Sequence, residues 1–274
     1  MGKLYVCGTP IGNLEDVSIR LLKTLRKVDM IACEDTRHSI KLLNRYKIKN
    51  KLISYHEHSN SEKENYILEQ LKRGLNIALI SDAGMPTISD PGEGLVRRVI
   101  EAGVEVEVIP GPSACIAALA ISGLDSSSFV FVGFLPPRSG KRRDMLASLK
   151  EEHRTLILYE APHRLLKILE DMEAILGEGR PITVARELTK IHQEVRRGSV
   201  REIKSYYTEN PPRGEICLLI PAQEEKVKAA DWDQIMRETI ELIESGVDKK
   251  EALKMKAQEY KVQKSIIYKI LLDK

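Results

Sequence analysis

The stretch SDAGMPTISDPG at residues 81–92 combines carboxylates with glycines and prolines, directly after the apolar run at 77–80. Glycine and proline hold the backbone in special conformations, and small side chains let a ligand approach backbone groups closely. We therefore predict a ligand-binding loop here. Asp90, Pro91 and Glu93 are expected to be the N-cap, first helical residue and capping-box partner of the next helix.

A second group of reactive side chains, CEDTRHS at 33–39, follows another apolar run. A carboxylate such as Glu34 or Asp35 at a strand end can accept a proton from a substrate hydroxyl. Arg37 can hold a phosphate through its planar fork of donors. The structural alternative for Asp35 is an N-cap with local ion pairs that opens the next helix.

Two further segments, YEAPHR at 159–164 and ARELTK at 185–190, place Glu160 and Glu187 at expected strand ends. Either acid can orient a hydroxyl or accept its proton, and Arg164 can bind a phosphate. The alternative is that both acids form structural ion pairs with the neighbouring arginines.

Cations gather in the run PPRSGKRR at 136–143, which holds Arg138, Lys141, Arg142 and Arg143 and no acid. This run is our main candidate for contacts with phosphates. A solvated surface loop is the alternative, because basic runs are common on protein surfaces.

Several common chemistries lack their motifs. The loop GTPIGNL at 8–14 contains Pro10 and only two glycines, so it is not a dinucleotide fingerprint. The sequence shows no Walker motif, no G-x-S-x-G nucleophile elbow and no metal-ligand spacing. We therefore expect no metal site.

Strands and helices alternate through the first part of the chain, which is typical of an α/β domain with a parallel sheet. We assign this domain to residues 1–122. Its strands are expected at 3–8, 30–34, 52–55, 76–81 and 105–110. Its helices are expected at 17–27, 39–46, 61–73 and 92–103.

Strands follow one another more closely in the next part, which favours a second α/β domain with a mixed sheet at 123–222. The expected strands are 129–134, 155–160, 182–186, 193–198 and 215–220, after a linker at 123–128.

Residues 230–274 show only helical periodicity and are interpreted as a small helix-turn-helix-like extension. Gly246 is expected to end its first helix, and Asp248 with Glu251 to begin the second. Lysines cluster in its last two helices: Lys249, Lys250, Lys254, Lys256, Lys261, Lys264 and Lys269. They fit contact with a nucleic acid backbone or, equally, a solvated face.

Composition limits the class of protein further. The formal net charge of +3 is mild, which argues against a protein that coats polyanions but allows a local basic patch. The cysteines are far apart and outside C-x-x-C pairs, as in a reducing compartment. No run approaches the roughly 20 apolar residues of a membrane span, and no signal segment is evident. We expect a soluble cytoplasmic protein.

Six motifs taken together resemble the tetrapyrrole-methylase-like superfamily of S-adenosylmethionine-dependent enzymes. The closest resemblance is to the branch that 2'-O-methylates a cytidine of bacterial small-subunit ribosomal RNA. It covers roughly residues 3 to 220, and the tail beyond 230 resembles the extension of that branch. The motifs are GTPIGNL at 8–14, CEDTRHS at 33–39, SDAGMPTISDPG at 81–92, PGPSA at 110–114, YEAPHR at 159–164 and ARELTK at 185–190.

The resemblance implies two α/β domains that bind S-adenosylmethionine in the cleft between them, and a homodimer. It also implies ribosomal RNA, or the assembled small subunit, as the partner. Carried over position by position, it implies cofactor contacts from Pro10, Asp82, Gly84, Met85, Pro86, Ile88, Ser113 and Ala114. Weaker candidates from the second domain are Phe134, Tyr159, Ala185 and Glu215.

The residue that removes the proton from the ribose hydroxyl stays open. Candidates are Glu34, Asp35, His163 and Glu187, with Arg37 and Arg164 on phosphate. Methylation of a tetrapyrrole carbon by the same fold is an alternative function, although the loop at 8–14 departs from the G-x-G-P-G-D style of those enzymes. A non-catalytic RNA-binding relative is another.

Overall fold

The computed structural model describes residues 1–56, 61–223, 231–260 and 262–272. The chain divides into two compact units, Met1–Gln223 and Glu224–Lys274. Two five-stranded sheets form the framework of the first unit.

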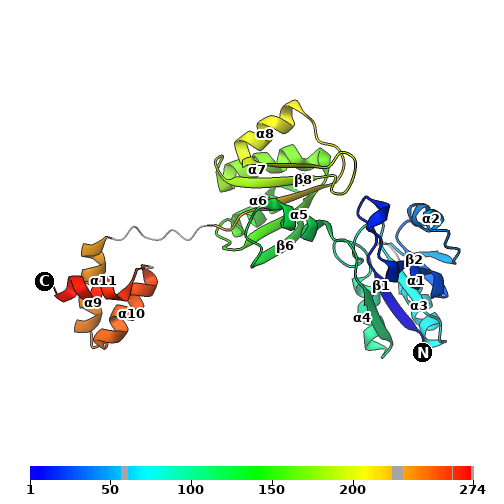
Figure 1. Ribbon diagram of the computed structural model, residues 1–274, viewed down its shortest axis with the longest axis horizontal. Helices are drawn as coiled ribbons and strands as arrows, with labels where there is room; N and C mark the ends of the chain where they lie inside the picture. Colours follow the sequence, from blue (N-terminus) through cyan, green and yellow to red (C-terminus); the bar gives the residue numbers. More distant parts are fainter. Residues whose placement is uncertain (57–60, 224–230, 261, 273–274) are drawn as a thin grey trace. The chain divides into compact units, whose positions relative to one another are not determined.

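The first sheet is parallel throughout. It consists of β1 (Lys3–Cys7), β2 (Met30–Cys33), β3 (Leu52–Ser54), β4 (Ile77–Ile80) and β5 (Glu105–Ile109). Their order is β3-β2-β4-β1-β5, and every pairing in it is parallel (Figure 1). The carboxyl ends of these strands therefore share one edge, where open α/β sheets bind ligands.

Amphipathic helices cover both faces of this sheet. On one face, α1 (Ile19–Lys27) and α2 (Thr36–Arg45) pack leucines against the strands. On the other, α3 (Ser61–Lys72) and α4 (Glu93–Glu101) do the same. A short 3-10 helix, η1 (Leu14–Asp16), precedes α1. The apolar stripe of each helix fits burial on one side only.

The starts of α2 and α4 differ from the predicted ones. Helix α2 starts at Thr36 rather than at residue 39, because the Asp35 side chain accepts the Arg37 N–H at 2.8 Å and caps it. Helix α4 starts at Glu93, with Gly92 as its N-cap and no side-chain cap bond. The prediction that Asp90 caps this helix is therefore wrong.

The second sheet is mixed. It consists of β6 (Phe129–Phe134), β7 (Thr155–Glu160), β8 (Pro181–Arg186), β9 (Glu194–Ser199) and β10 (Ile216–Ile220). Their order is β6-β7-β10-β8-β9, where β6 and β7 are parallel and the other pairs antiparallel. The predicted fold class, a parallel first sheet and a mixed second one, is confirmed.

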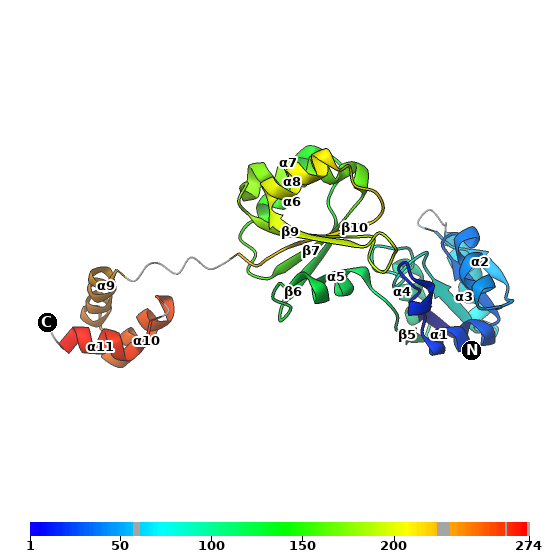
Figure 2. The ribbon, with the colours of Figure 1, turned by 45° about the horizontal axis from the view of Figure 1, so that its top comes forward.

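Helices also sandwich the second sheet, as Figure 2 shows. One face packs against α5 (Ala114–Ser122). The other carries α6 (Ser139–Ser148), α7 (Leu165–Leu176) and α8 (Val200–Glu209), which bury the largest core cluster. A 3-10 turn, η2 (Pro162–Arg164), leads into α7. The basic run at 136–143 is thus helical from Ser139 onward, which sets the direction of its side chains.

The second unit contains α9 (Trp232–Glu244), α10 (Lys249–Glu259) and α11 (Lys264–Leu272). These helices surround a small core of Ile235, Met236, Leu253, Tyr260 and Ile267. As predicted, Gly246 follows the end of α9 with φ +97°, and Asp248 caps α10. Lys261 lies outside the described residues.

In the described part of the chain, none of the helices has the length and apolar character needed to span a bilayer.

Candidate functional site

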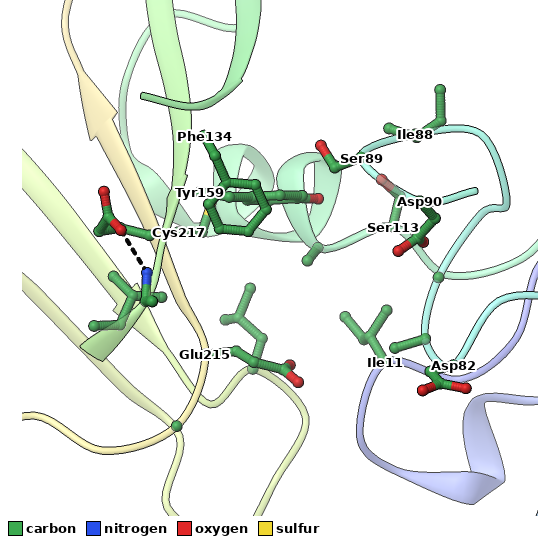
Figure 3. A pocket seen from close by; sticks show the side chains of 18 of the residues that line it. Ile11, Asp82, Ile88, Ser89, Asp90, Ser113, Phe134, Tyr159, Glu215 and Cys217 are labelled. Atoms are coloured by element: carbon green, nitrogen blue, oxygen red, sulfur yellow. Dashed lines mark hydrogen bonds between the residues drawn. The ribbon is translucent and has the colours of Figure 1, made fainter. Parts of the chain in front are cut away.

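A cavity of about 410 Å³ lies at the carboxyl edge of the first sheet and reaches the second sheet. Figure 3 shows side chains that line it. Loops after β1, β2, β4 and β5 form one part of the lining, and the ends of β6, β7, β8 and β10 form the other. Its size and its mixture of apolar and polar groups suit an organic ligand of nucleoside size.

The loop after β1 is hydrogen-bonded to the walls of this cavity on two sides. The Thr9 N–H donates to the Gly84 carbonyl at 2.8 Å, and the Thr9 hydroxyl donates to the Ser81 carbonyl at 3.2 Å. The Asn13 N–H donates to Oγ1 of Thr189 at 3.0 Å. Because Thr189 follows β8, one loop holds segments of both sheets in a fixed relation around the cavity.

The loop after β4 contains strained backbone. Thr87 has φ +75° and Ser89 has φ +62°, although neither is a glycine. A side chain in this left-handed region costs about 1–3 kcal/mol. Gly84 and Gly92 also have positive φ, where glycine is tolerated freely. The surrounding contacts must hold this loop in place, and such strain is common where a loop binds a ligand.

One end of the cavity is aromatic. The rings of Phe134 and Tyr159 meet edge to face, with centroids 5.7 Å apart. The Tyr159 hydroxyl accepts the Cys115 N–H at 3.1 Å, which satisfies a donor in the first turn of α5. Burial raises the pKa of Tyr159, so the hydroxyl stays protonated. This bond fixes the start of α5, where Ser113 and Ala114 line the cavity.

Replacing Tyr159 with phenylalanine is expected to lower the free energy of unfolding by about 1–2 kcal/mol, because the buried Cys115 N–H loses its partner. Urea denaturation measures the change. Tyr66→Phe is the control, since Tyr66 is exposed on α3 and a change there should stay within about 0.5 kcal/mol. Equal losses in the two variants would contradict the structural role of the Tyr159 hydroxyl.

Carboxylates give the cavity a negative lining, among them Glu34, Asp82, Asp90 and Glu215. Oδ1 of Asp82 accepts the Asp35 N–H at 3.1 Å, which fixes its orientation. Burial, together with the nearby carboxylates, raises the pKa of Asp90 to about 6. A cavity with this charge favours a cationic ligand.

Most residues predicted to bind the cofactor line this cavity. They are Asp82, Gly84, Met85, Ile88, Ser113, Ala114, Phe134, Tyr159, Ala185 and Glu215. Pro10 and Pro86 are buried and lie outside the lining. The cavity is also lined by Ile11, Leu188 and Cys217, for which no cofactor contact was predicted. Ile11 lies in the motif at 8–14 and Leu188 in the motif at 185–190. Their places in these motifs were the signal that could have predicted a cofactor contact.

The predicted catalytic residues do not come together. Glu34 lines the cavity. Asp35 caps α2, as its structural alternative states, and pairs with Arg37 at 2.8 Å. Hydrogen bonds from Arg37 lower the pKa of Asp35 to about 2, which makes it a weak base. His163 is exposed in η2 and lies outside the cavity lining.

The remaining acids of the two later motifs are engaged in the fold. Oε1 of Glu187 lies 2.9 Å from the Lys190 ammonium and accepts the Glu215 N–H at 2.9 Å. Partial burial raises the pKa of Glu187, but these hydrogen bonds outweigh it and the net shift is downward. Glu160 pairs with Arg164 at 3.1 Å. The structural alternative is thus confirmed for Glu160, whereas Glu187 pairs with a lysine rather than an arginine.

The predicted phosphate contacts separate into buried and exposed groups. Arg142 is buried and its Nη2 lies 2.6 Å from Asp171, so its burial argues against a direct contact with RNA. Arg164 donates to the Leu135 carbonyl at 2.7 Å, so its guanidinium has a structural role. The exposed predicted contacts are Arg37, Arg138, Lys141 and Arg143.

Comparison with protein families gives one match over most of the chain. A family model described as Tetrapyrrole (Corrin/Porphyrin) Methylases matches residues 3–204. The solved structure of the methyltransferase CobJ superposes with a TM-score of 0.63 at 18% identity, covering 81% of this chain and 95% of that one. At this identity the likeness concerns the fold alone.

Curated relatives extend the similarity to nearly the full length. A Synechocystis protein named Ribosomal RNA small subunit methyltransferase I is 45% identical over 274 residues, 100% of this chain and 98% of that protein. A Thermotoga maritima protein of the same name is 50% identical over 224 residues, 82% of this chain and 100% of that protein.

Proposed function

Because the chain belongs to the tetrapyrrole methylase family, we propose that it transfers a methyl group from S-adenosylmethionine to the 2'-oxygen of a cytidine ribose in small-subunit ribosomal RNA. The observation that carries the substrate class is the sequence similarity to proteins named as small-subunit ribosomal RNA methyltransferases. They are 45% and 50% identical to this chain, over 100% and 82% of its length. The predicted resemblance to this family is confirmed.

The cavity fits the methyl donor. Its volume of about 410 Å³ lies in the range of small-molecule sites, and its carboxylates complement a sulfonium and an ammonium group. The apolar side chains of Ile11, Met85 and Leu188 offer contacts for an adenine ring and a thioether chain. The cofactor supplies a methyl group activated by the positive charge on sulfur.

The contribution of the protein is mainly positioning. Transfer to a ribose oxygen needs that oxygen in line with the methyl carbon, and fixed alignment supplies much of the rate. The bonds of Thr9 and Asn13 hold loops of both sheets rigidly. The Tyr159 hydroxyl holds the start of α5 in the same way. These contacts prepare the site before either substrate binds.

Exposed cations supply the surface for RNA. Three of them lie at the start of α6: Arg138, Lys141 and Arg143. This helix follows β6, whose last residue is Phe134. Lys249, Lys250 and Lys254 are exposed on α10 of the second unit. Phosphate contacts of this kind orient RNA on a protein without reading its sequence.

The predicted homodimer and the cytoplasmic location stay predictions.

Methyl transfer with a labelled cofactor tests the function. The substrates are unmethylated small ribosomal subunits, naked small-subunit RNA and a porphyrinogen. We expect label in RNA, at a cytidine whose 3' linkage becomes resistant to alkali because its 2'-oxygen is blocked. Label only in the porphyrinogen would favour the tetrapyrrole alternative, and no turnover with any substrate would favour a binding protein.

A further inference from the structure

Asp90 is a pocket carboxylate that caps no helix. The sequence predicts it as the cap of α4, yet Gly92 takes that position and α4 begins at Glu93. The Asp90 side chain lines the cavity instead, in the same loop as Ser89 and Ile88 (Figure 3). A carboxylate that caps no helix and lines a ligand cavity is available for chemistry.

The backbone around Asp90 is held in strained conformations. Thr87 and Ser89, on its amino-terminal side, have φ +75° and +62°, and Gly92 has φ +136°. A Cβ added at Gly92 would lie 2.9 Å from Cδ2 of Leu79 on β4. Core packing therefore keeps this turn tight, and Asp90 stays at the cavity wall.

The charged groups that act on Asp90 are carboxylates. They come from three elements: Glu34 after β2, Asp82 after β4 and Glu215 before β10. Within the residues that the structure describes, no lysine or arginine forms an ion pair with Asp90. Burial is the largest effect that raises the pKa of Asp90 to about 6, and a hydrogen bond with Ser81 opposes it. A base with a pKa near the working pH accepts protons efficiently.

We propose that Asp90 is the base that accepts the proton of the ribose 2'-hydroxyl, an inference that rests on the proposed function. The 2'-oxygen bonds to the methyl carbon, the sulfur–methyl bond breaks, and its electron pair stays on sulfur. The proton passes to the Asp90 carboxylate and from there to water. The products are the 2'-O-methylated ribose and S-adenosylhomocysteine.

The other candidates fit this role less well. Arg37 stabilises the ionised form of Asp35, and Lys190 does the same for Glu187. His163 does not line the cavity. Glu34 also lines the cavity, and its charge is one of those that raise the pKa of Asp90. Asp90 combines access to the cavity with the absence of a cationic partner among the described side chains.

The variant Asp90→Asn tests the proposal, because it keeps the shape of the side chain and removes the base. We expect kcat to fall at least about 100-fold, while the Kd for S-adenosylhomocysteine, measured by calorimetry, changes less than about threefold. Glu93→Gln is the matched control. It alters an exposed carboxylate that pairs with Arg97 on α4, outside the cavity, and should keep the parental kcat.

The pH profile separates a base from a structural carboxylate. A base works in its ionised form, so kcat/KM for the donor should fall as the pH drops below about 6, the pKa of Asp90 in the free protein. A bound cationic donor favours the carboxylate, so the same limb in kcat should lie at lower pH. Asp90→Asn should lose this limb, and Asp90→Glu should recover part of it.

Three results would overturn the proposal. Asp90→Asn with kcat within about threefold of the parent would exclude a base at this position. A loss of S-adenosylhomocysteine binding that matches the loss of kcat would make Asp90 a donor-binding residue. If the parent protein methylates no RNA, the proposed function fails together with this inference. If the parent methylates RNA and Asp90→Asn is equally active, the role of Asp90 is refuted while the proposed function stands.

Discussion

Replacing Gly111 with alanine should lower the free energy of unfolding by about 3 kcal/mol and weaken the binding of S-adenosylhomocysteine at least about tenfold. Gly111 follows β5, beside Gly8 at the end of β1. A Cβ at Gly111 would lie 2.6 Å from the Gly8 carbonyl oxygen and 2.9 Å from its Cα. Both atoms belong to the main chain, so no side-chain rotation relieves the overlap.

The expected loss of binding follows from where this contact lies. The chain after Gly8 carries Thr9, which bonds to the Gly84 carbonyl, and the chain after Gly111 carries Ser113 and Ala114 into the cavity. Forcing the two backbones apart therefore moves both walls of the site. Chemical denaturation gives the change in stability, and calorimetry gives the Kd.

Gly140→Ala is the matched control for this experiment. Gly140 is exposed in α6, and nothing lies within 4 Å of a Cβ built there. Alanine is favoured over glycine in a helix by about 0.5–1 kcal/mol, so this variant should be slightly more stable. If Gly111→Ala behaves like Gly140→Ala, the close approach of β1 and β5 is not what shapes the cavity.

Much of the fold follows from local patterns that the sequence displays. The four residues of β4, Ile77–Ile80, are all buried, and continuous apolar runs of this kind are typical of parallel strands covered on both faces. The helix starts were harder to place. Asp35 and Asp90 both precede a helix, yet only Asp35 caps one. The difference depends on the tertiary position of Gly92, which lies against Leu79.

The site was predictable where a motif ends a strand, and less so where a side chain's direction decides its role. Met85 and Ser113 were placed by motifs that follow β4 and β5, and both line the cavity. Loops have no period from which the direction of Asp90 could be read. In the basic run all four cations were predicted as phosphate contacts and no helix was predicted, but α6 begins at Ser139 and turns Arg142 inward with Leu146.

Arg142→Ala is accordingly expected to act on stability, lowering the free energy of unfolding by about 3 kcal/mol. Nε of Arg142 donates to Oδ2 of Asp171 at 2.7 Å, and Nη1 donates to the Pro137 carbonyl at 3.0 Å. The side chains of Arg142 and Asp171 are only 7% and 12% exposed. Without Arg142, the ion pair that the buried carboxylate keeps among the described residues is the one with Arg143, at 3.3 Å and half exposed. The double variant Arg142→Met with Asp171→Leu should recover most of the loss, because it buries no charge.

Arg138→Ala should show the opposite behaviour, since Arg138 is exposed at the start of α6. We expect its unfolding free energy to stay within about 0.5 kcal/mol of the parent. Its affinity for RNA should fall, and the slope of log affinity against log salt should flatten by about one, the signature of one lost phosphate contact. Urea denaturation and RNA binding at several salt concentrations compare the two arginines. If Arg142→Ala kept its stability and flattened the salt slope, Arg142 would be an RNA contact after all, because a buried structural cation cannot release counterions from RNA.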